Sequence, residues 1–320
     1  MRLGAWTLCL SLATPAVAGD FRLDLPIDCI VGETCHIQQY VDHDPGPGAL
    51  DYLCQGLSYN THKGTDFALP YLRDIADDVD VLAAADGVVR AARDGMADRL
   101  FDRETGQAVD GKECGNRVVL RHADGWETQY CHLKRGSITV RKGQRVKAGT
   151  PLGHVGLSGR TQFPHLHLSV RQNGAVVDPF APDVSQTCAP AEHTLWTEQP
   201  SYQPGGLIGV GFNAAVPDYG DVKLGVADQS PLPRDAPALV FWAYAFGSQP
   251  GDFLRLSVKG PAGFAFDQKI ELTRQQAQFF RAAGKRLKED RWPSGIYSGT
   301  AELIREKQII DRKDLRMSLD

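Results

Sequence analysis

Histidine and aspartate residues recur at short spacings in three parts of this chain. They stand in the segments 62–66 (His-Lys-Gly-Thr-Asp), 128–133 (Thr-Gln-Tyr-Cys-His-Leu) and 164–170 (Pro-His-Leu-His-Leu-Ser-Val). Imidazole nitrogens and carboxylate oxygens are donors that suit zinc. A site with three protein donors leaves the fourth position of a tetrahedral ion open for water, which is typical of a catalytic rather than a structural zinc site.

The histidine pair in 164–170 predicts a strand. Polar and aliphatic residues alternate strictly through this segment, and residues two apart on a strand share a face. His165 and His167 therefore point to one side, about 7 Å apart along the strand, while Leu166 and Leu168 point into a core. A solvent-facing strand with two histidines would show the same pattern, so the pair alone does not define a site.

The other two segments also have ordinary interpretations when each is taken singly. His62 and Asp66 lie in a stretch that would suit a surface turn. Period two places Tyr130 and His132 on one face of a strand, where His132 alone would suit packing at a strand end. The joint occurrence of the three segments, in a chain rich in β-like runs, favours a shared metal site.

Short β-like runs punctuated by glycine fill the region from 59 to 179, which predicts an all-β core. Asp124 and Gly125 predict a tight hairpin between two of these runs, because both positions tolerate positive φ. A polar stretch, 93–113, interrupts two runs, and a loop of that length is typical of a functional element such as a groove wall. The predicted strands are 79–82, 87–91, 117–121, 128–133, 138–140, 152–155 and 165–170.

The 320 residues are enough for about two domains. Between 182 and 204 the composition turns to Pro, Ser, Thr and Gln without periodicity, which predicts a linker. Beyond the linker we expect an accessory antiparallel β-sandwich with Trp242 and Trp292 in its core, although 273–287 would also suit a helix. The predicted strands of this second unit are 207–212, 239–246, 253–258, 264–270 and 296–304.

The first eighteen residues predict a secretory signal peptide. They carry one cation, Arg2, then an apolar stretch and small residues before a cleavage position near Ala18. The apolar stretch is shorter than the 20 or so residues that span a bilayer, so we expect an exported protein, periplasmic or secreted, without stable membrane insertion. The mature chain has a formal charge of −5 and no block of Lys or Arg, which gives no support for nucleic-acid binding.

Six cysteines remain after the predicted cleavage, and in an oxidising compartment an even number favours three disulfides. Closeness in sequence favours a Cys29–Cys35 pair. A shared hairpin favours Cys114–Cys131, which leaves Cys54 to pair with Cys188. The lead-in, 19–58, is thus expected to be a loop-rich segment stapled by disulfides.

From about 59 to 180 the sequence resembles the lysostaphin-type (LytM-like) zinc endopeptidases of peptidoglycan. The resemblance implies a mainly β fold, in which 59–184 is a zinc metallopeptidase domain with an antiparallel β-core and an open groove, followed by a linker (185–204) and the accessory domain (205–320). It implies one zinc ion on His62, Asp66 and His167, with His132 and His165 as the two catalytic histidines. The segments that carry it, in family order, are 62–70, 83–89, 115–122, 124–133, 140–149, 152–156 and 164–168.

The function implied by the resemblance is hydrolysis of peptide cross-links in bacterial peptidoglycan. Zinc polarises a carbonyl and lowers the pKa of bound water toward about 7, and a histidine takes or orients the proton. One alternative is a catalytically silent wall-binding or regulatory module that activates another wall hydrolase. Another is an exported metallopeptidase that acts on proteins.

Three residues depart from the family pattern. Gln162 and Phe163 stand where relatives have a small residue and glycine, so we expect Phe163 to narrow the groove and contact substrate. Tyr130, on the predicted face of His132, would also suit contact with substrate, although a tyrosine packed within the strand fits the same pattern. Ser169 stands where the family commonly has glutamate, which concerns the orientation of a ligand histidine rather than the ligands themselves.

Overall fold

The computed structural model describes residues 20–102, 109–184, 188–189 and 191–320. The predicted signal peptide lies outside the described residues, as does part of the loop predicted at 93–113. Within the described ranges, no helix combines the length and the apolar character needed to cross a membrane.

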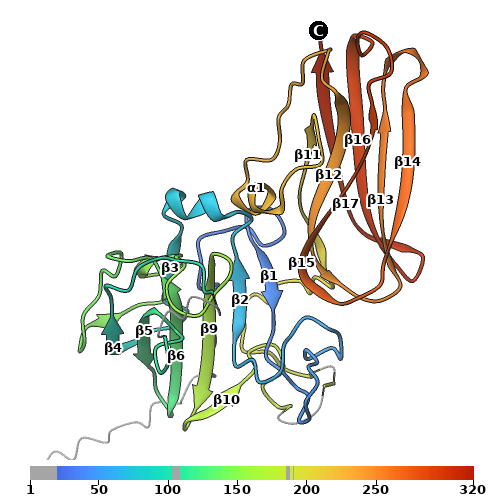
Figure 1. The fold of residues 1–320 in the computed structure, drawn as a ribbon. Helices are drawn as coiled ribbons and strands as arrows, with labels where there is room; N and C mark the ends of the chain where they lie inside the picture. The colour runs from blue at the N-terminus through green and yellow to red at the C-terminus, as the bar shows by residue number, and fades with distance from the viewer. Residues whose placement is uncertain (1–19, 103–108, 185–187, 190) are drawn as a thin grey trace, which may run out of the picture.

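The first half of the chain forms an antiparallel sheet in the order β1-β2-β9-β6-β5-β4-β7, with β10 paired to β9 (Figure 1). A short pair, β3 and β8, lies beside this sheet, and a 3-10 helix, η1 (Leu72–Asp77), follows β2. The strands are β1 (His36–Gln39), β2 (Thr65–Ala68), β3 (Asp80–Leu82), β4 (Gly87–Arg93), β5 (Asn116–Arg121), β6 (Trp126–Leu133), β7 (Arg145–Val146), β8 (Pro151–His154), β9 (His165–Gln172) and β10 (Ala175–Val177).

Alternation along β9 fixes which face of this sheet is the core. Leu166 and Leu168 are fully buried in a cluster with Phe67 of β2 and Leu120 of β5, as the sequence pattern predicts. The opposite face of β9 carries its two histidines. The predicted hairpin is also confirmed: Asp124 and Gly125, with φ of 50° and 75°, turn the chain between β5 and β6.

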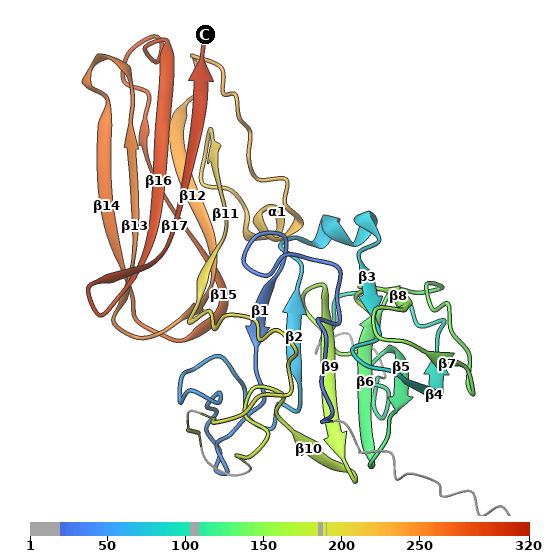
Figure 2. The same cartoon turned by 180° about the vertical axis from the view of Figure 1, so that it is seen from behind.

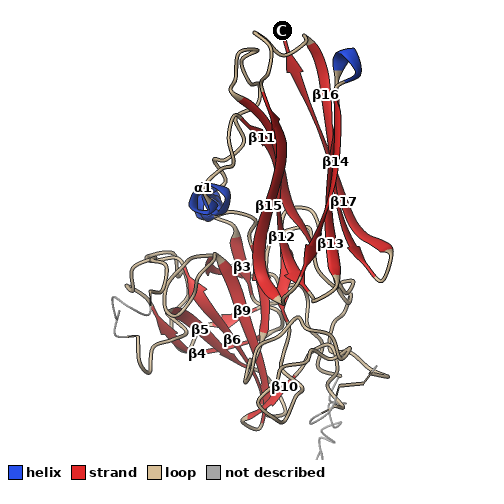
Figure 3. Cartoon of the chain, turned by 45° about the vertical axis from the view of Figure 1, so that its right-hand side comes forward, coloured by secondary structure: helices blue, strands red, loops and turns tan. Residues whose placement is uncertain are grey.

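The second half forms two packed antiparallel sheets, seen from the side in Figure 3. One has the order β11-β12-β15 and the other β14-β13-β16-β17. Buried side chains such as Phe241, Leu254 and Leu303 fill the space between them, as expected for the predicted sandwich. The elements are β11 (Gly206–Asn213), α1 (Tyr219–Leu224), β12 (Ala238–Ser248), β13 (Asp252–Lys259), η2 (Pro261–Gly263), β14 (Ala265–Leu272), β15 (Gln276–Arg286), β16 (Gly295–Arg305) and β17 (Gln308–Leu319).

Several local expectations need correction. The helix considered at 273–287 is wrong, because β15 occupies most of that range and pairs along its length with β12. Trp292 does lie in the sandwich core, but Trp242 faces outward into a small cluster with Val222 and Tyr244 beside α1. The run 138–140 is not a strand.

The lead-in is less irregular than expected, because it supplies β1, the strand that pairs with β2. The three expected disulfides are confirmed: Cys29–Cys35, Cys54–Cys188 and Cys114–Cys131. The Cys54–Cys188 bond joins residues 134 apart in sequence, so it ties the lead-in to the chain that follows β10.

Candidate metal centre

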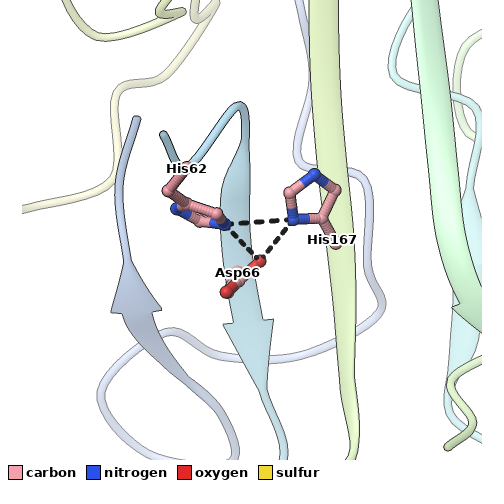
Figure 4. Close-up of side chains that lie close together, drawn as sticks. All are labelled: His62, Asp66 and His167. Atoms are coloured by element: carbon pink, nitrogen blue, oxygen red, sulfur yellow. Dashed lines mark hydrogen bonds and ion pairs between the residues drawn. The ribbon is translucent and has the colours of Figure 1, made fainter. Parts of the chain in front are cut away.

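His62, Asp66 and His167 converge on one point of the sheet (Figure 4). Asp66 Oδ1 lies 2.7 Å from His167 Nδ1 and 3.2 Å from His62 Nε2. The two nitrogens are 3.1 Å apart. His62 and Asp66 are buried, and the side chain of His167 is 15% exposed, so the cluster is open to solvent mainly on the His167 side.

The sheet register explains this convergence. Asp66 of β2 is the direct cross-strand partner of His167 of β9, and such partners share a face. His62 reaches the same point from the turn before β2. Gly64 lets that turn pass close to β9, because a Cβ at this position would lie 2.6 Å from His167 Nε2 and 2.5 Å from the Leu168 carbonyl oxygen.

The charge of the cluster is set by its carboxylate. Burial acts to raise the pKa of Asp66, but His62, His165 and His167 outweigh it and hold that pKa well below its ordinary value. Burial likewise acts to lower the pKa of His62, and the Asp66 carboxylate raises it. Asp66 is therefore ionised in the folded protein, and its negative charge favours positive charge beside it.

The donor set fits a single zinc ion. With bonds of 2.0–2.1 Å, two ligands of a tetrahedral ion are roughly 3.3 Å apart, close to the separations found here. The second nitrogens of both ligand histidines are engaged elsewhere: His62 Nδ1 donates to the Tyr40 carbonyl at 2.7 Å, and His167 Nε2 lies 3.0 Å from Ser169 Oγ. Such contacts fix the tautomer that presents a lone pair to a metal. The hydroxyl of Ser169 therefore contacts the ring of His167, at the position where the family commonly has a glutamate.

His132 and His165 lie beside this cluster, with ring centroids 4.6 Å apart. His165 Nε2 is 3.5 Å from Asp66 Oδ1. Each ring is fixed through Nδ1, which donates to the Phe163 carbonyl in His165 (2.9 Å) and to the Ser158 carbonyl in His132 (2.8 Å). Burial lowers the pKa of both histidines, so both are neutral at pH 7.

His132 reaches the site through a β-bulge that simple alternation did not predict. Residues 131 and 132 of β6 together oppose the single residue 117 of β5, and His132 has a φ of 63°. A bulge of this kind redirects a side chain and is common next to active sites. The bulge turns His132 toward His165, away from the face that its neighbour Tyr130 occupies.

The expectation that Tyr130 contacts substrate is wrong. Its ring is fully buried in the core, and its hydroxyl accepts hydrogen bonds from the Ala84 amide at 2.8 Å and the Thr128 hydroxyl at 3.0 Å. Tyr130 is the cross-strand partner of Leu168, which also faces the core. Phe163, in contrast, does lie at the site, where its half-buried ring stacks on His165 with centroids 4.4 Å apart.

Three further contributors to the site were not identified from sequence. Tyr40 and Ser158 act through backbone carbonyls, which any residue type carries, so the sequence holds no signal for them. Tyr59, half exposed, places its ring 4.4 Å from that of His62. In the sequence, the one signal for Tyr59 was that an aromatic residue stands three positions before the candidate ligand His62.

The fold and the site thus define a β-rich protein with a candidate mononuclear metal centre flanked by two neutral histidines. Comparison with known proteins gives the family: residues 60–179 match the model of Peptidase family M23. The chain therefore carries a domain of peptidase family M23, which confirms the family resemblance inferred from the sequence.

Among curated relatives, the "DD-carboxypeptidase/endopeptidase Mpg" of Neisseria meningitidis is 34% identical over 124 residues, 39% of this chain and 23% of the relative. The "Peptidoglycan DD-endopeptidase ShyA" of Vibrio cholerae is 32% identical over 123 residues, 38% of this chain and 23% of the relative. The chain thus spans less than a quarter of the length of these relatives. Among solved structures, the catalytic domain of the M23 protein EnpA from Enterococcus faecalis aligns with 50% of this chain over 96% of its own length, at 24% sequence identity. The TM-score of 0.33 is too low to bear on function.

Proposed function

We propose that this protein is a zinc-dependent endopeptidase that hydrolyses peptide cross-links of bacterial peptidoglycan. The observation that carries the proposal is the convergence of His62, Asp66 and His167, whose donor atoms all lie within 4.8 Å of one another, inside an M23 domain. The names of the relatives, which are DD-endopeptidases of peptidoglycan, support the choice of substrate.

The three donors would hold one zinc ion, which when bound supplies a Lewis acid and acidifies a water molecule. The two flanking histidines would do the proton chemistry. Neutral imidazoles fixed through Nδ1 can accept a proton at Nε2, and proton transfer by a positioned side chain contributes typically 10²–10⁴-fold to a rate. One of His132 and His165 would take the proton of the attacking water, and the other would stabilise the oxyanion or protonate the leaving amine.

The proposal includes the division of the chain into a signal peptide cleaved near Ala18, a lead-in to residue 58, a peptidase domain (59–184), a linker (185–204) and an accessory domain (205–320). It also includes export to the periplasm or the exterior, where peptidoglycan lies. Three disulfides support an oxidising compartment, because such bonds persist there.

The test is digestion of purified, cross-linked sacculi by the full-length protein, with released peptides identified by mass. We expect peptides opened at cross-links, loss of release after treatment with a chelator, and recovery on addition of zinc. A panel of glycine-rich proteins, run in parallel, tests for a protein substrate. Protein that binds sacculi but releases no peptide with zinc present would contradict the proposal and support the regulatory alternative.

A further inference from the structure

Strand β1 lies between β2, the strand that carries Asp66, and the C-terminal sandwich (Figures 1 and 2). On one side it pairs with β2, where Gln39 is the partner of Asp66. On the other side its side chains meet β12 and β15 of the sandwich. His36 packs its ring on Phe246 of β12 with centroids 4.4 Å apart.

The side-chain amide of Gln38 is the centre of this contact. It is fully buried, and both of its ends are satisfied. Its Nε2 donates to the Ala277 carbonyl of β15 at 2.8 Å, and its Oε1 accepts from Gln278 Nε2 at 3.0 Å. His36 Nε2 lies 3.1 Å from the same oxygen. Because an unsatisfied buried amide is costly, this network fixes β1 against β15.

The same strand also positions two of the three candidate ligands. Gln38 is the extra residue of a bulge, since Ile37 pairs with Phe67 and Gln39 with Asp66. Two residues after Gln38, the carbonyl of Tyr40 accepts the hydrogen bond from His62 Nδ1 at 2.7 Å. A displacement of β1 would therefore move both the partner of Asp66 and the acceptor that sets the tautomer of His62.

We propose that Gln38 is a positioning residue through which the C-terminal sandwich holds His62 and Asp66 in the geometry that binds zinc. This inference rests on the proposed function, because it concerns the affinity of the same metal centre. It assigns the sandwich a part in supporting that centre. Contacts that orient metal ligands typically change metal affinity by 10–100-fold when they are removed.

The test compares the zinc Kd of full-length variants, measured by competition with a chromophoric chelator. Gln38→Ala removes the whole amide network, and we expect zinc to bind about 10-fold or more weakly. Gln278→Ala removes one donor from the sandwich side and should weaken binding by several-fold. The matched control is Gln249→Ala, which deletes a contact between the two halves of the chain, Gln249 Nε2 to Gln55 Oε1 at 3.3 Å, that does not involve β1. The control should bind zinc as the wild type does.

Thermal unfolding of each variant checks that the fold is retained. If Gln38→Ala does not fold, Gln278→Ala carries the test, because its side chain is only partly buried. Folded variants with the zinc Kd of wild type, or a control weakened as much as Gln278→Ala, would overturn the inference and leave the proposed function standing. A wild-type protein that does not bind zinc would overturn both.

Discussion

The chemistry of the candidate centre depends on which nitrogen of each histidine is already engaged. His62 presents Nε2 and His167 presents Nδ1 toward Asp66, and in both rings the other nitrogen is occupied by a protein oxygen. His132 and His165 are instead fixed through Nδ1 by backbone carbonyls. Under the proposed function, the four imidazoles thus divide into two that would hold the cation and two that would exchange protons.

This division predicts separable effects of substitution. His132→Ala and His165→Ala should each retain one zinc per chain, while the rate of peptide release falls by about 10²–10⁴-fold. The measurement is metal content by atomic absorption beside the rate of cleavage of a cross-linked muropeptide. Loss of zinc in either variant, equal to that in a ligand variant, would show that the assigned roles are wrong.

Ser169 offers a test of ligand orientation. Its hydroxyl is buried, and Oγ lies 3.0 Å from His167 Nε2. We expect Ser169→Ala to weaken zinc binding by roughly 10-fold, because the contact that holds the ring is lost. Ser318→Ala, at the exposed end of β17, is the control and should leave the zinc Kd unchanged. An unaltered Kd in Ser169→Ala would mean that strand pairing alone orients His167.

At the scale of elements, the approach of the 62–66 turn to β9 leaves no room for a side chain at Gly64. We expect Gly64→Ala to lower the free energy of unfolding by roughly 1–3 kcal/mol and to reduce zinc binding, since the new methyl group would meet His167 and the backbone of Leu168. Thermal unfolding and metal content are the measurements.

A matched glycine in α1 provides the control for that substitution. A Cβ at Gly220 would meet nothing within 4 Å. Gly220→Ala should therefore retain zinc and raise stability by up to about 1 kcal/mol, because alanine favours the helix. Similar losses of stability in both variants would contradict the steric account of Gly64.

The elements that sequence predicts well are those whose pattern is local. The alternation in β9 and the Asp124-Gly125 hairpin are both found as expected, because each depends on neighbours a few residues away. The bulge at His132 could not be read from the sequence, since it depends on the register between β5 and β6. It is also why Tyr130 was assigned to the wrong face.

At the scale of the whole molecule, strand β1 was not predicted because its burial depends on contacts with a distant part of the chain. His36 and Gln38 are polar, yet they are buried by a sandwich more than 200 residues away in sequence. A pattern of polar residues indicates exposure unless a distant surface covers them. The convergence of His62, Asp66 and His167 was predicted only through the family resemblance. The pairing of β2 with β9 that brings them together links residues about 100 apart in sequence and could not be derived from the residues alone.

His36 makes the contact between the two halves of the chain sensitive to pH. Burial lowers its pKa from 6.5 to about 4; the hydrogen bond with Gln38 opposes this effect and the charge of Lys313 adds to it. Below pH 6.5 the imidazole of His36 becomes protonated in the unfolded chain, whereas in the folded chain it stays neutral until about pH 4. The free energy of unfolding should therefore fall as pH drops through this window, by roughly 3 kcal/mol in total.

Urea titrations between pH 7 and pH 4 measure this dependence. His36→Phe keeps a ring against Phe246 and cannot be protonated, so its stability should fall less steeply than that of wild type over the same range. Subtracting the two curves removes the contribution of carboxylates common to both. Parallel curves would show that His36 does not have the depressed pKa.

The account depends most on the claim that His62, Asp66 and His167 together bind one zinc ion. The direct measurement is zinc stoichiometry, by inductively coupled plasma mass spectrometry, of the folded wild-type protein and of His167→Ala after dialysis against trace zinc. The account predicts one zinc per wild-type chain and none in the variant. A wild-type chain without zinc, or a folded His167→Ala variant that keeps its zinc, would contradict it.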